Sequence, residues 1–159
     1  MINVEVDDLS SAEVLALVEA HLIEMARVSP PGSVNAIDAA LLRAPNVTFF
    51  VARIDGQVCG CGALKNLSAS AGEVKSMRTR SGFERRGVGQ SILDTIVRVG
   101  RERGHQALYL ETGTGEAFAA AHKFYQRNGF NYVASFGEYA ASSFNRFMAK
   151  SLQAGSAPL

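Results

Sequence analysis

The sequence predicts a single α/β domain in which a mixed, mostly antiparallel central sheet is flanked by about four helices. The chain has 159 residues, which is close to the usual size of one domain. Apolar residues recur at helical spacing in some segments and form short runs typical of strands in others. No internal repeat, linker or low-complexity segment divides the chain.

The N-terminal part is predicted to hold one strand and two helices. The strand covers residues 2–6, and Ser10 with Glu13 forms a capping box that starts the first helix. The apolar residues of that helix share one face: Val14, Leu17, Val18, Leu22 and Met25. The Ser-Pro-Pro-Gly-Ser segment at 29–33 ends this helix, and Ser33 is expected to cap a second, short one.

An antiparallel hairpin follows. Two apolar runs, at 47–54 and 57–65, are joined by Asp55-Gly56, which is a strong signal for a two-residue turn between strands. Residues 72–79 read as a further strand, and residues 80–84 form a loop.

Helices and strands alternate in the C-terminal half. Apolar positions between Val88 and Val97 predict a third helix that ends before Gly104. The remaining elements are a strand at 107–111, a helix at 115–128 and two strands at 130–133 and 145–150. The resulting order is β-α-α-β-β-β-α-β-α-β-β. The domain is expected to span 1–150, with 151–159 as a flexible tail.

Charge is balanced overall but unevenly distributed. The net charge of +1 gives no electrostatic basis for a nucleic-acid or anionic membrane partner. Residues 1–42 hold seven acidic residues against one basic residue, whereas residues 75–105 hold eight basic against three acidic. Solvated faces of amphipathic helices explain most such patterns, and the alternative is attraction of cations at one end and of anions in the middle.

The cysteines and histidines do not suggest a disulfide or a metal site. Cys59 and Cys61 are expected to be small strand residues on one face, and their spacing does not favour a bridge. His21, His105 and His122 are scattered without zinc-ligand spacing, so no metal is predicted. The sequence has no secretion signal and no membrane-spanning run, which makes the cytoplasm the default location.

A glycine-rich segment, residues 85–90, lies where a loop feeds a helix. Gly87 and Gly89 lack a Cβ, so a pyrophosphate can approach the unpaired backbone N–H groups, and Arg85 and Arg86 add charge. The alternative is an ordinary helix start with solvated arginines. A Walker loop is excluded because no Gly-Lys-Ser/Thr follows, and the third glycine of a Rossmann fingerprint is missing.

Three motifs together resemble a known superfamily. The Arg-Arg-Gly-Val-Gly segment at 85–89 is preceded by Gly-Glu-Val-Lys-Ser-Met-Arg-Thr at 72–79 and followed by Phe-Tyr-Gln-Arg-Asn-Gly-Phe at 124–130. In this order they resemble the GNAT superfamily of acetyl-CoA-dependent N-acetyltransferases, in particular its small bacterial members. Two positions depart from the family pattern: Glu84 replaces the first Gln/Arg of the glycine motif, and Phe118 stands where many members have Asn.

The resemblance implies acetyl-CoA as co-substrate and direct acetyl transfer to a primary amine, without a metal or a covalent intermediate. Met77 and Thr79 match positions whose backbone holds the pantetheine arm, and the Met77 N–H is the expected oxyanion donor. The pyrophosphate is then expected to be bound by the glycine motif: Arg85, Arg86, Gly87, Val88, Gly89 and Gln90.

Two residues are predicted to be catalytic. Tyr125 matches a tyrosine that in many family members protonates the coenzyme sulfur; the alternative is a half-buried packing aromatic. Glu73 is the candidate general base, because strand alternation is expected to place it on the same face as Lys75 and Met77. The alternative for Glu73 is a surface carboxylate at a strand end.

The acceptor amine is left open by the sequence. A small molecule is expected, with Glu111 as a weaker candidate for amine recognition and His122 as a weaker functional candidate. Acetylation of protein N-termini or lysines is a rival within the class, and a non-catalytic sensor of acetyl-CoA is a rival outside it. A homodimer, in which a second copy of the chain is the partner, is an alternative to the monomer.

Overall fold

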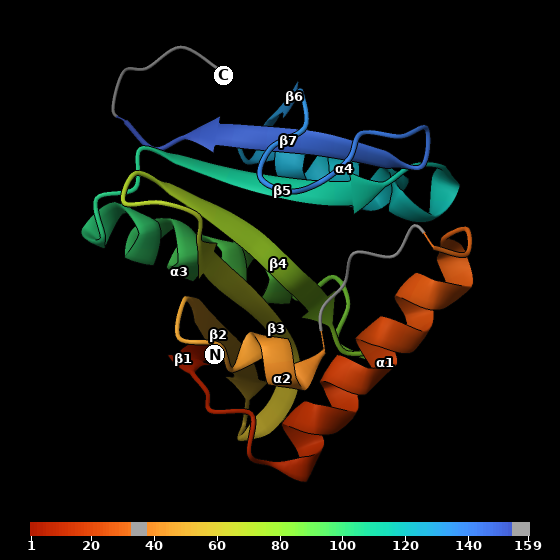
Figure 1. The fold of residues 1–159 in the computed structure, drawn as a ribbon. Helices are drawn as coiled ribbons and strands as arrows, with labels where there is room; N and C mark the ends of the chain where they lie inside the picture. Colours follow the sequence, from red (N-terminus) through yellow and green to blue (C-terminus); the bar gives the residue numbers. More distant parts are fainter. Residues whose placement is uncertain (33–37, 154–159) are drawn as a thin grey trace.

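The computed structural model describes residues 1–32 and 38–153, which form one sheet with helices on both faces (Figure 1). The strands are β1 (Ile2–Val6), β2 (Val47–Ile54), β3 (Gln57–Asn66), β4 (Ala71–Thr79), β5 (Ala107–Gly113), β6 (Asn131–Val133) and β7 (Asn145–Ser151). The helices are α1 (Ala12–Val28), α2 (Ala39–Leu42), α3 (Val88–Glu102) and α4 (Ala119–Arg127), with a short 3-10 helix, η1 (Glu116–Phe118), directly before α4. The predicted α/β class and order of elements are confirmed.

The seven strands lie in the order β1-β2-β3-β4-β5-β7-β6. All neighbours are antiparallel except β4 and β5, which are parallel. The predicted hairpin joins β2 to β3, and Asp55 and Gly56 have φ values of 49° and 80°. Two positive φ values in a two-residue loop match the twist of the flanking strands, which explains this turn.

The helices cover two apolar cores, one on each face of the sheet. On one face α3 buries Ile92, Leu93 and Ile96 against the sheet. On the other face α1 buries Leu17 and Val18. Figure 1 shows α1 and α2 in front of the sheet and α3 behind it. Among residues 1–32 and 38–153, no helix is both long and apolar enough to cross a membrane.

The last strand extends past residue 150. β7 continues to Ser151, and Leu152 is buried in the core on the α3 face. The Leu152 N–H also donates to the carbonyl of Gln106. These two residues therefore pack with the domain, and residues 154–159 of the predicted tail lie outside the described residues.

The helix caps differ from the predicted ones. α1 is capped by Ser11, whose side chain accepts from the Val14 N–H, so the expected capping box of Ser10 and Glu13 is wrong. The Glu13 carboxylate instead accepts from the Val58 N–H at 2.6 Å, a tertiary bond that local spacing does not reveal. Ser33 lies outside the described residues, and Asp38 caps α2.

The expectation that Cys59 and Cys61 share a face is also wrong. Both thiols are free and buried. The β2–β3 register shifts at this point, so that Cys59 is skipped as a bulge residue. Cys59 consequently packs in the core on the α3 face and Cys61 in the core on the α1 face, because a bulge interrupts strand alternation.

Candidate active site

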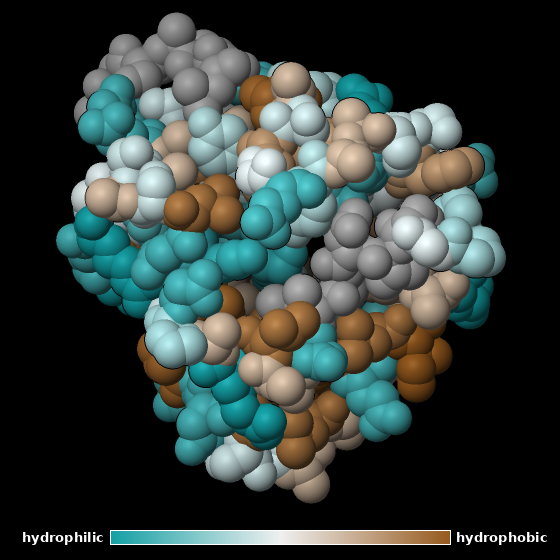
Figure 2. All heavy atoms as spheres, in the orientation of Figure 1, coloured by the Kyte–Doolittle hydropathy of each residue, from teal (hydrophilic) through white to brown (hydrophobic). Residues whose placement is uncertain are grey.

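β4 and β5 pair only over their first residues. The ladder joins Ala71, Gly72 and Glu73 to three residues at the start of β5 and then ends. Beyond Glu73 the strands diverge, as Figure 1 shows, and the surface in the same orientation is hollowed there (Figure 2). Strands that part cannot pair their facing backbone groups with each other, which leaves those groups available to a ligand. Two cavities are lined by residues from this region.

A β-bulge in β4 distributes its side chains between the two faces. Ser76 and Met77 together lie opposite the single residue Gly62, and Ser76 has a φ of 56°. Met77 packs on the α3 face, where its Sδ lies against Gly62. Val74 also packs on that face, so its neighbour Glu73 points to the α1 face. The expectation that Glu73 and Met77 share a face is therefore wrong, although both line the same cavity.

The larger cavity has a volume of about 520 Å³ and lies between β4, α3 and α4. Phe124 and Tyr125 form its α4 wall. Most residues predicted to bind the coenzyme line this cavity: Met77, Thr79, Arg85, Gly87, Val88, Gly89 and Gln90. Its volume falls within the range of about 300–1,000 Å³ typical of ligand sites.

The N-terminus of α3 borders this cavity. Its N-cap, Gly87, has a φ of 83°, a left-handed conformation that favours glycine, and no side chain caps the helix. The first N–H groups are thus left for a ligand, and the helix dipole favours an anion. A Cβ on Gly89 would lie 3.7 Å from the Phe124 ring and 3.9 Å from Thr79 Oγ1, which are ordinary contact distances to two residues of the cavity lining.

Three side chains of the glycine motif interact with other protein groups. The Arg86 guanidinium stacks 5.2 Å from the Phe83 ring and does not line the cavity. The Glu84 carboxylate accepts backbone N–H groups of its own loop, which holds its pKa below the usual value. Gln90 lines the cavity, but its amide also binds Asn128 and so ties α3 to the end of α4.

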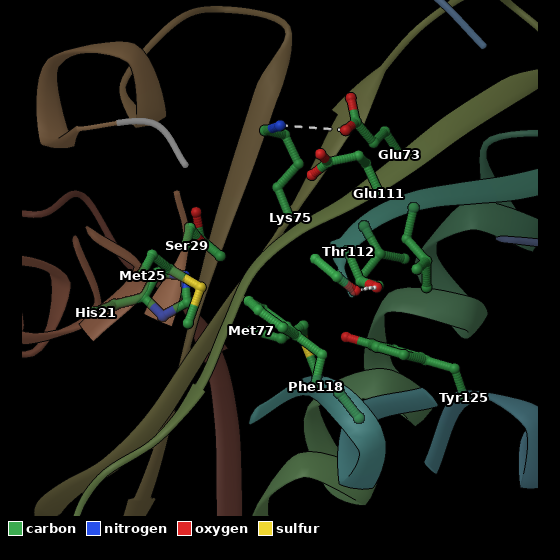
Figure 3. A pocket seen from close by; sticks show the side chains of 15 residues that line it. His21, Met25, Ser29, Glu73, Lys75, Met77, Glu111, Thr112, Phe118 and Tyr125 are labelled. Atoms are coloured by element: carbon green, nitrogen blue, oxygen red, sulfur yellow. Dashed lines mark hydrogen bonds and ion pairs between the residues drawn. The ribbon is translucent and has the colours of Figure 1, made fainter. Parts of the chain in front are cut away.

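The smaller cavity, of about 160 Å³, contacts helices on both faces of the sheet through the gap between β4 and β5. Figure 3 shows side chains from α1 on one side of it and side chains from β4, β5 and α4 on the other. Its lining includes His21, Met25, Ser29, Glu73, Lys75, Glu111, Thr112 and Phe118. Met77, Ala121 and Tyr125 line both cavities, so the two spaces meet at these residues.

Glu73 is only 1% exposed, which excludes the alternative of a surface carboxylate. Its Oε2 accepts from Lys75 Nζ at 3.1 Å and from the Tyr139 hydroxyl at 2.6 Å, and Lys75 also contacts that hydroxyl. No described residue donates to its Oε1. Burial and the bond to Glu73 raise the pKa of Tyr139, which keeps this hydroxyl a donor. The sequence gives no signal for Tyr139, which lies in the segment between β6 and β7.

Tyr125 both packs and lines the cavities. Its ring contacts Phe124 and Phe130 edge to face, at centroid distances of 5.2 and 5.4 Å. Its hydroxyl has no hydrogen-bond partner among the described residues, and Figure 3 shows it directed toward the space beside Thr112. Burial raises the pKa of Tyr125, so the phenol stays protonated near neutral pH.

His122 lies outside the cavity lining and forms a hydrogen bond with Thr112. Its Nε2 lies 2.5 Å from Thr112 Oγ1 and 3.0 Å from the Gly113 carbonyl oxygen, which can only accept, so Nε2 donates. Its Nδ1 faces the Tyr132 hydroxyl at 3.2 Å. Thr112 and Glu111 line the smaller cavity, and His122 does not.

His21 is a cavity residue that sequence reasoning missed. The available signal was a polar residue at helical spacing from Leu17 and Val18, on the apolar face of α1. Burial, together with the positive charge of Arg78, lowers the pKa of His21 to about 4, so the imidazole is neutral near pH 7.

Residues 14–130 match the model of the Acetyltransferase (GNAT) family. The uncharacterized N-acetyltransferase YsnE of Bacillus subtilis is 39% identical over 150 residues, which cover 94% of this chain and 99% of the relative. The uncharacterized N-acetyltransferase YedL of Escherichia coli is 41% identical over 152 residues, covering 96% of each chain.

Solved structures share the fold. A putative acyl-CoA N-acyltransferase from Klebsiella pneumoniae has a TM-score of 0.78 at 24% identity, with 96% of this chain and 99% of that chain covered. A GNAT family acetyltransferase from Elizabethkingia anophelis, solved with acetyl-CoA bound, has a TM-score of 0.68 at 13% identity, with 94% and 97% covered. The family match and the named relatives extend over most of the chain, which therefore belongs to the GNAT family of acetyltransferases and is an acyltransferase.

Proposed function

We propose that the larger cavity binds acetyl-CoA and that the smaller cavity receives a primary amine of a small molecule, to which the acetyl group is transferred directly. The observation that carries this proposal is that Met77 and Tyr125 line both cavities. A thioester that enters along α3 and an amine that enters beside α1 would meet at these two residues, and such positioning is itself a large source of rate enhancement.

The N-terminus of α3 supports the coenzyme half of the proposal. Its free N–H groups and the nearby Arg85 suit the pyrophosphate of the coenzyme. The relative solved with acetyl-CoA shares the fold, which supports the same class of co-substrate here.

In the proposed reaction, the amine nitrogen attacks the thioester carbonyl carbon, and the carbonyl oxygen takes the negative charge. The backbone N–H of Met77, in the bulged part of β4, is the proposed donor to that oxyanion. The C–S bond then breaks, and the thiolate takes a proton from the Tyr125 hydroxyl. Tyr125 suits this role because burial keeps it protonated.

An ammonium acceptor must lose a proton before it attacks, and Glu73 is the proposed base. Lys75 and Tyr139 both bind its Oε2, which leaves Oε1 to take the proton directly or through a water. The attached nitrogen loses its second proton as the amide forms, and this proton restores the Tyr125 hydroxyl. The overall reaction converts an ammonium and a thioester into an amide, a thiol and one proton, which leaves the site from Glu73.

The size of the smaller cavity supports a small-molecule acceptor over a protein one. Its volume of about 160 Å³ is similar to that of a cavity which holds benzene, about 150 Å³. An acceptor of a few heavy atoms beyond its amine would fill it.

The test is to incubate the protein with acetyl-CoA and a panel of small amines, and with peptides that present a free N-terminus or a lysine, while following thiol release. Release with small amines, and a product heavier by one acetyl group, is the expected result. Faster turnover of the peptides would favour the protein-acetylating alternative. Binding of acetyl-CoA without turnover of any amine would favour the sensor.

A further inference from the structure

Three buried polar atoms without a hydrogen-bond partner come from α1 and the β4 bulge. They are His21 Nδ1, Ser76 Oγ and Arg78 Nε. The only other such atom in the described residues is Nδ1 of His105, which lies beside Gly72 at the other end of β4. Buried polar groups in native proteins are nearly always paired, so three unpaired groups in one region require an explanation.

The three side chains lie close to one another, two of them in the lining of the smaller cavity and Arg78 in the lining of the larger one. His21 is 9% exposed and lines the smaller cavity together with Ser76. Arg78 lies opposite Cys61, which packs in the core under α1, so Arg78 is on the α1 face as well. Arg78 is near enough to His21 for its charge to act on the imidazole. Figure 3 shows His21 across the cavity from Glu73 and Lys75.

This cluster carries the positive charge of Arg78, on which the carboxylates of Glu24 and Glu84 act only from beyond salt-bridge distance. None of the ion pairs within the described residues involves Arg78. The other cation of the region, Lys75, is paired with Glu73 at 3.1 Å. A guanidinium is always charged and offers a planar fork of N–H donors, which matches the two oxygens of a carboxylate.

We propose that His21, Ser76 and Arg78 bind a carboxylate of the acceptor, so that the substrate is an amino acid or another small molecule carrying both an amine and a carboxylate. This inference rests on the proposed acetyl transfer. The Arg78 N–H groups would bind the carboxylate oxygens, and the Ser76 hydroxyl and the His21 N–H would donate to them. Glu73, in the same cavity, would receive the proton of the amine.

The neutral state of His21 fits this assignment. A neutral imidazole donates one N–H without placing a second positive charge beside Arg78. The acceptor is thereby held at two points, and a substrate fixed at both ends loses less entropy when it reacts. A simple alkylamine has no carboxylate and would be held only at its amine.

The test compares matched acceptors that differ only in the carboxylate. The ω-amino acids from glycine to 5-aminopentanoate, together with common α-amino acids, are compared with their carboxamides in thiol release. We expect kcat/KM for the best acid to exceed that for its amide by about tenfold or more, since one lost charged hydrogen bond costs about this factor. O-phosphoethanolamine is included, and a preference for it would replace the carboxylate with a phosphate and overturn the assignment.

Variants locate the effect. Arg78→Gln, Ser76→Ala and His21→Leu should each lower the acid-to-amide ratio of kcat/KM, and Arg78→Lys should retain part of it. The ratio is the readout because Arg78 lines the larger cavity, and a loss of coenzyme binding affects both acceptors equally. Arg98→Gln is the matched control, because Arg98 is exposed on α3 and paired with Glu102. Equal turnover of acids and amides by the unaltered protein would overturn the inference and leave acetyl transfer intact.

A binding measurement separates the two proposals. In the presence of coenzyme A, 4-aminobutanoate should shift the imidazole NMR signals of His21 and not those of His105, whereas 4-aminobutanamide should shift neither. If these shifts occur without turnover of any amine, the carboxylate site stands and the proposed reaction fails. If His21 does not respond to a carboxylate that is turned over, the site is wrong.

Discussion

Tyr139 and Glu73 are joined by a hydrogen bond of 2.6 Å although 66 residues separate them in the chain. Tyr139 comes from the segment between β6 and β7, and its ring packs against Phe136 and Phe147. The segment is thereby anchored beside the smaller cavity, and the Glu73 carboxylate is held in one orientation by a residue outside β4.

Replacing Tyr139 by Phe removes this bond and keeps the ring. We expect kcat to fall by about tenfold, since a hydrogen bond to a charged group contributes about 1.5–3 kcal/mol and Glu73 would lose its fixed orientation. The KM for acetyl-CoA should not change. Tyr132→Phe is the control, because Tyr132 is partly exposed and lines neither cavity. A Tyr139→Phe variant with normal kcat and a lower melting temperature would show that the bond only stabilises the fold.

Replacing Tyr125 by Phe should separate packing from proton donation. The ring contacts with Phe124 and Phe130 remain, so the thermal stabilisation by acetyl-CoA should be unchanged. Turnover should fall by about 10² or more if the hydroxyl protonates the thiolate. Steady-state kinetics together with a thermal-shift titration measure both effects. Unchanged turnover would leave Tyr125 as a packing residue.

Glu73→Gln keeps the size of the side chain and removes its basicity. Turnover near pH 7 should therefore drop, and it should recover partly at higher pH, where more of the amine is already neutral. The measurement is kcat/KM against pH for both proteins. Superimposable profiles would exclude Glu73 as the base.

A structural side effect of Glu73→Gln must be separated from the chemical one. The substitution leaves the ammonium of Lys75 buried without its anionic partner, and breaking a buried pair costs about 3–5 kcal/mol. The double variant Glu73→Gln, Lys75→Met removes both charges and should recover most of that stability in urea unfolding. If it recovers stability but not turnover, the loss of rate is chemical.

The two glycines of the motif should respond differently to substitution. A Cβ on Gly89 has ordinary contact distances in the protein, so Gly89→Ala should fold with normal stability. Its methyl group would occupy the space in front of α3 and weaken acetyl-CoA binding by about tenfold or more. Gly87→Ala would lose stability as well, by about 1–2 kcal/mol, because φ is 83° there. Isothermal titration and thermal unfolding distinguish the two cases, and normal coenzyme affinity in Gly89→Ala would argue against the proposed pyrophosphate position.

The sequence predicted those features that depend on local spacing. The order of elements, the Asp55-Gly56 turn and the glycine motif all follow from short-range patterns, and the structure contains each of them. The bulges at Cys59 and Ser76 were not predictable, because a register shift depends on the partner strand. For the same reason the faces of Glu73 and Met77 were assigned incorrectly.

Site residues that act through tertiary contacts were also missed. Tyr139 reaches Glu73 from a segment without a periodic pattern, and Thr112 reaches the cavity only because β5 diverges from β4. His21 carried a local signal, a polar residue on an apolar helix face, but its unpaired Nδ1 becomes visible only when α1 lies against β4. Such residues are defined by the packing of elements and not by their spacing.

The burial of His21 predicts a specific dependence of stability on pH. Its pKa is about 4 in the folded protein against 6.5 as the ordinary value, so the unfolded chain binds the proton more tightly. The folded state therefore has its full stability, as far as His21 is concerned, above pH 6.5. Part of the free energy of unfolding is lost as the pH falls toward 4, because the unfolded chain then takes up a proton at His21 more readily than the folded protein does. Relative to pH 7, the free energy of unfolding is expected to fall by roughly 2 kcal/mol at pH 5 and roughly 3 kcal/mol at pH 4 on account of His21.

Urea unfolding of the protein and of His21→Leu at pH 7, 5.5, 5 and 4.5 measures this contribution. The free energy of unfolding of the unaltered protein should fall more steeply with decreasing pH than that of the variant. Burial also lowers the pKa of His105, but this residue is present in both proteins and cancels in the difference. Parallel curves would mean that His21 titrates normally and is not a buried neutral imidazole. Saturation with an acceptor that carries a carboxylate should reduce the difference in slope, because the negative charge of the bound carboxylate favours a protonated His21 and so opposes the effects of burial and of Arg78 on its pKa.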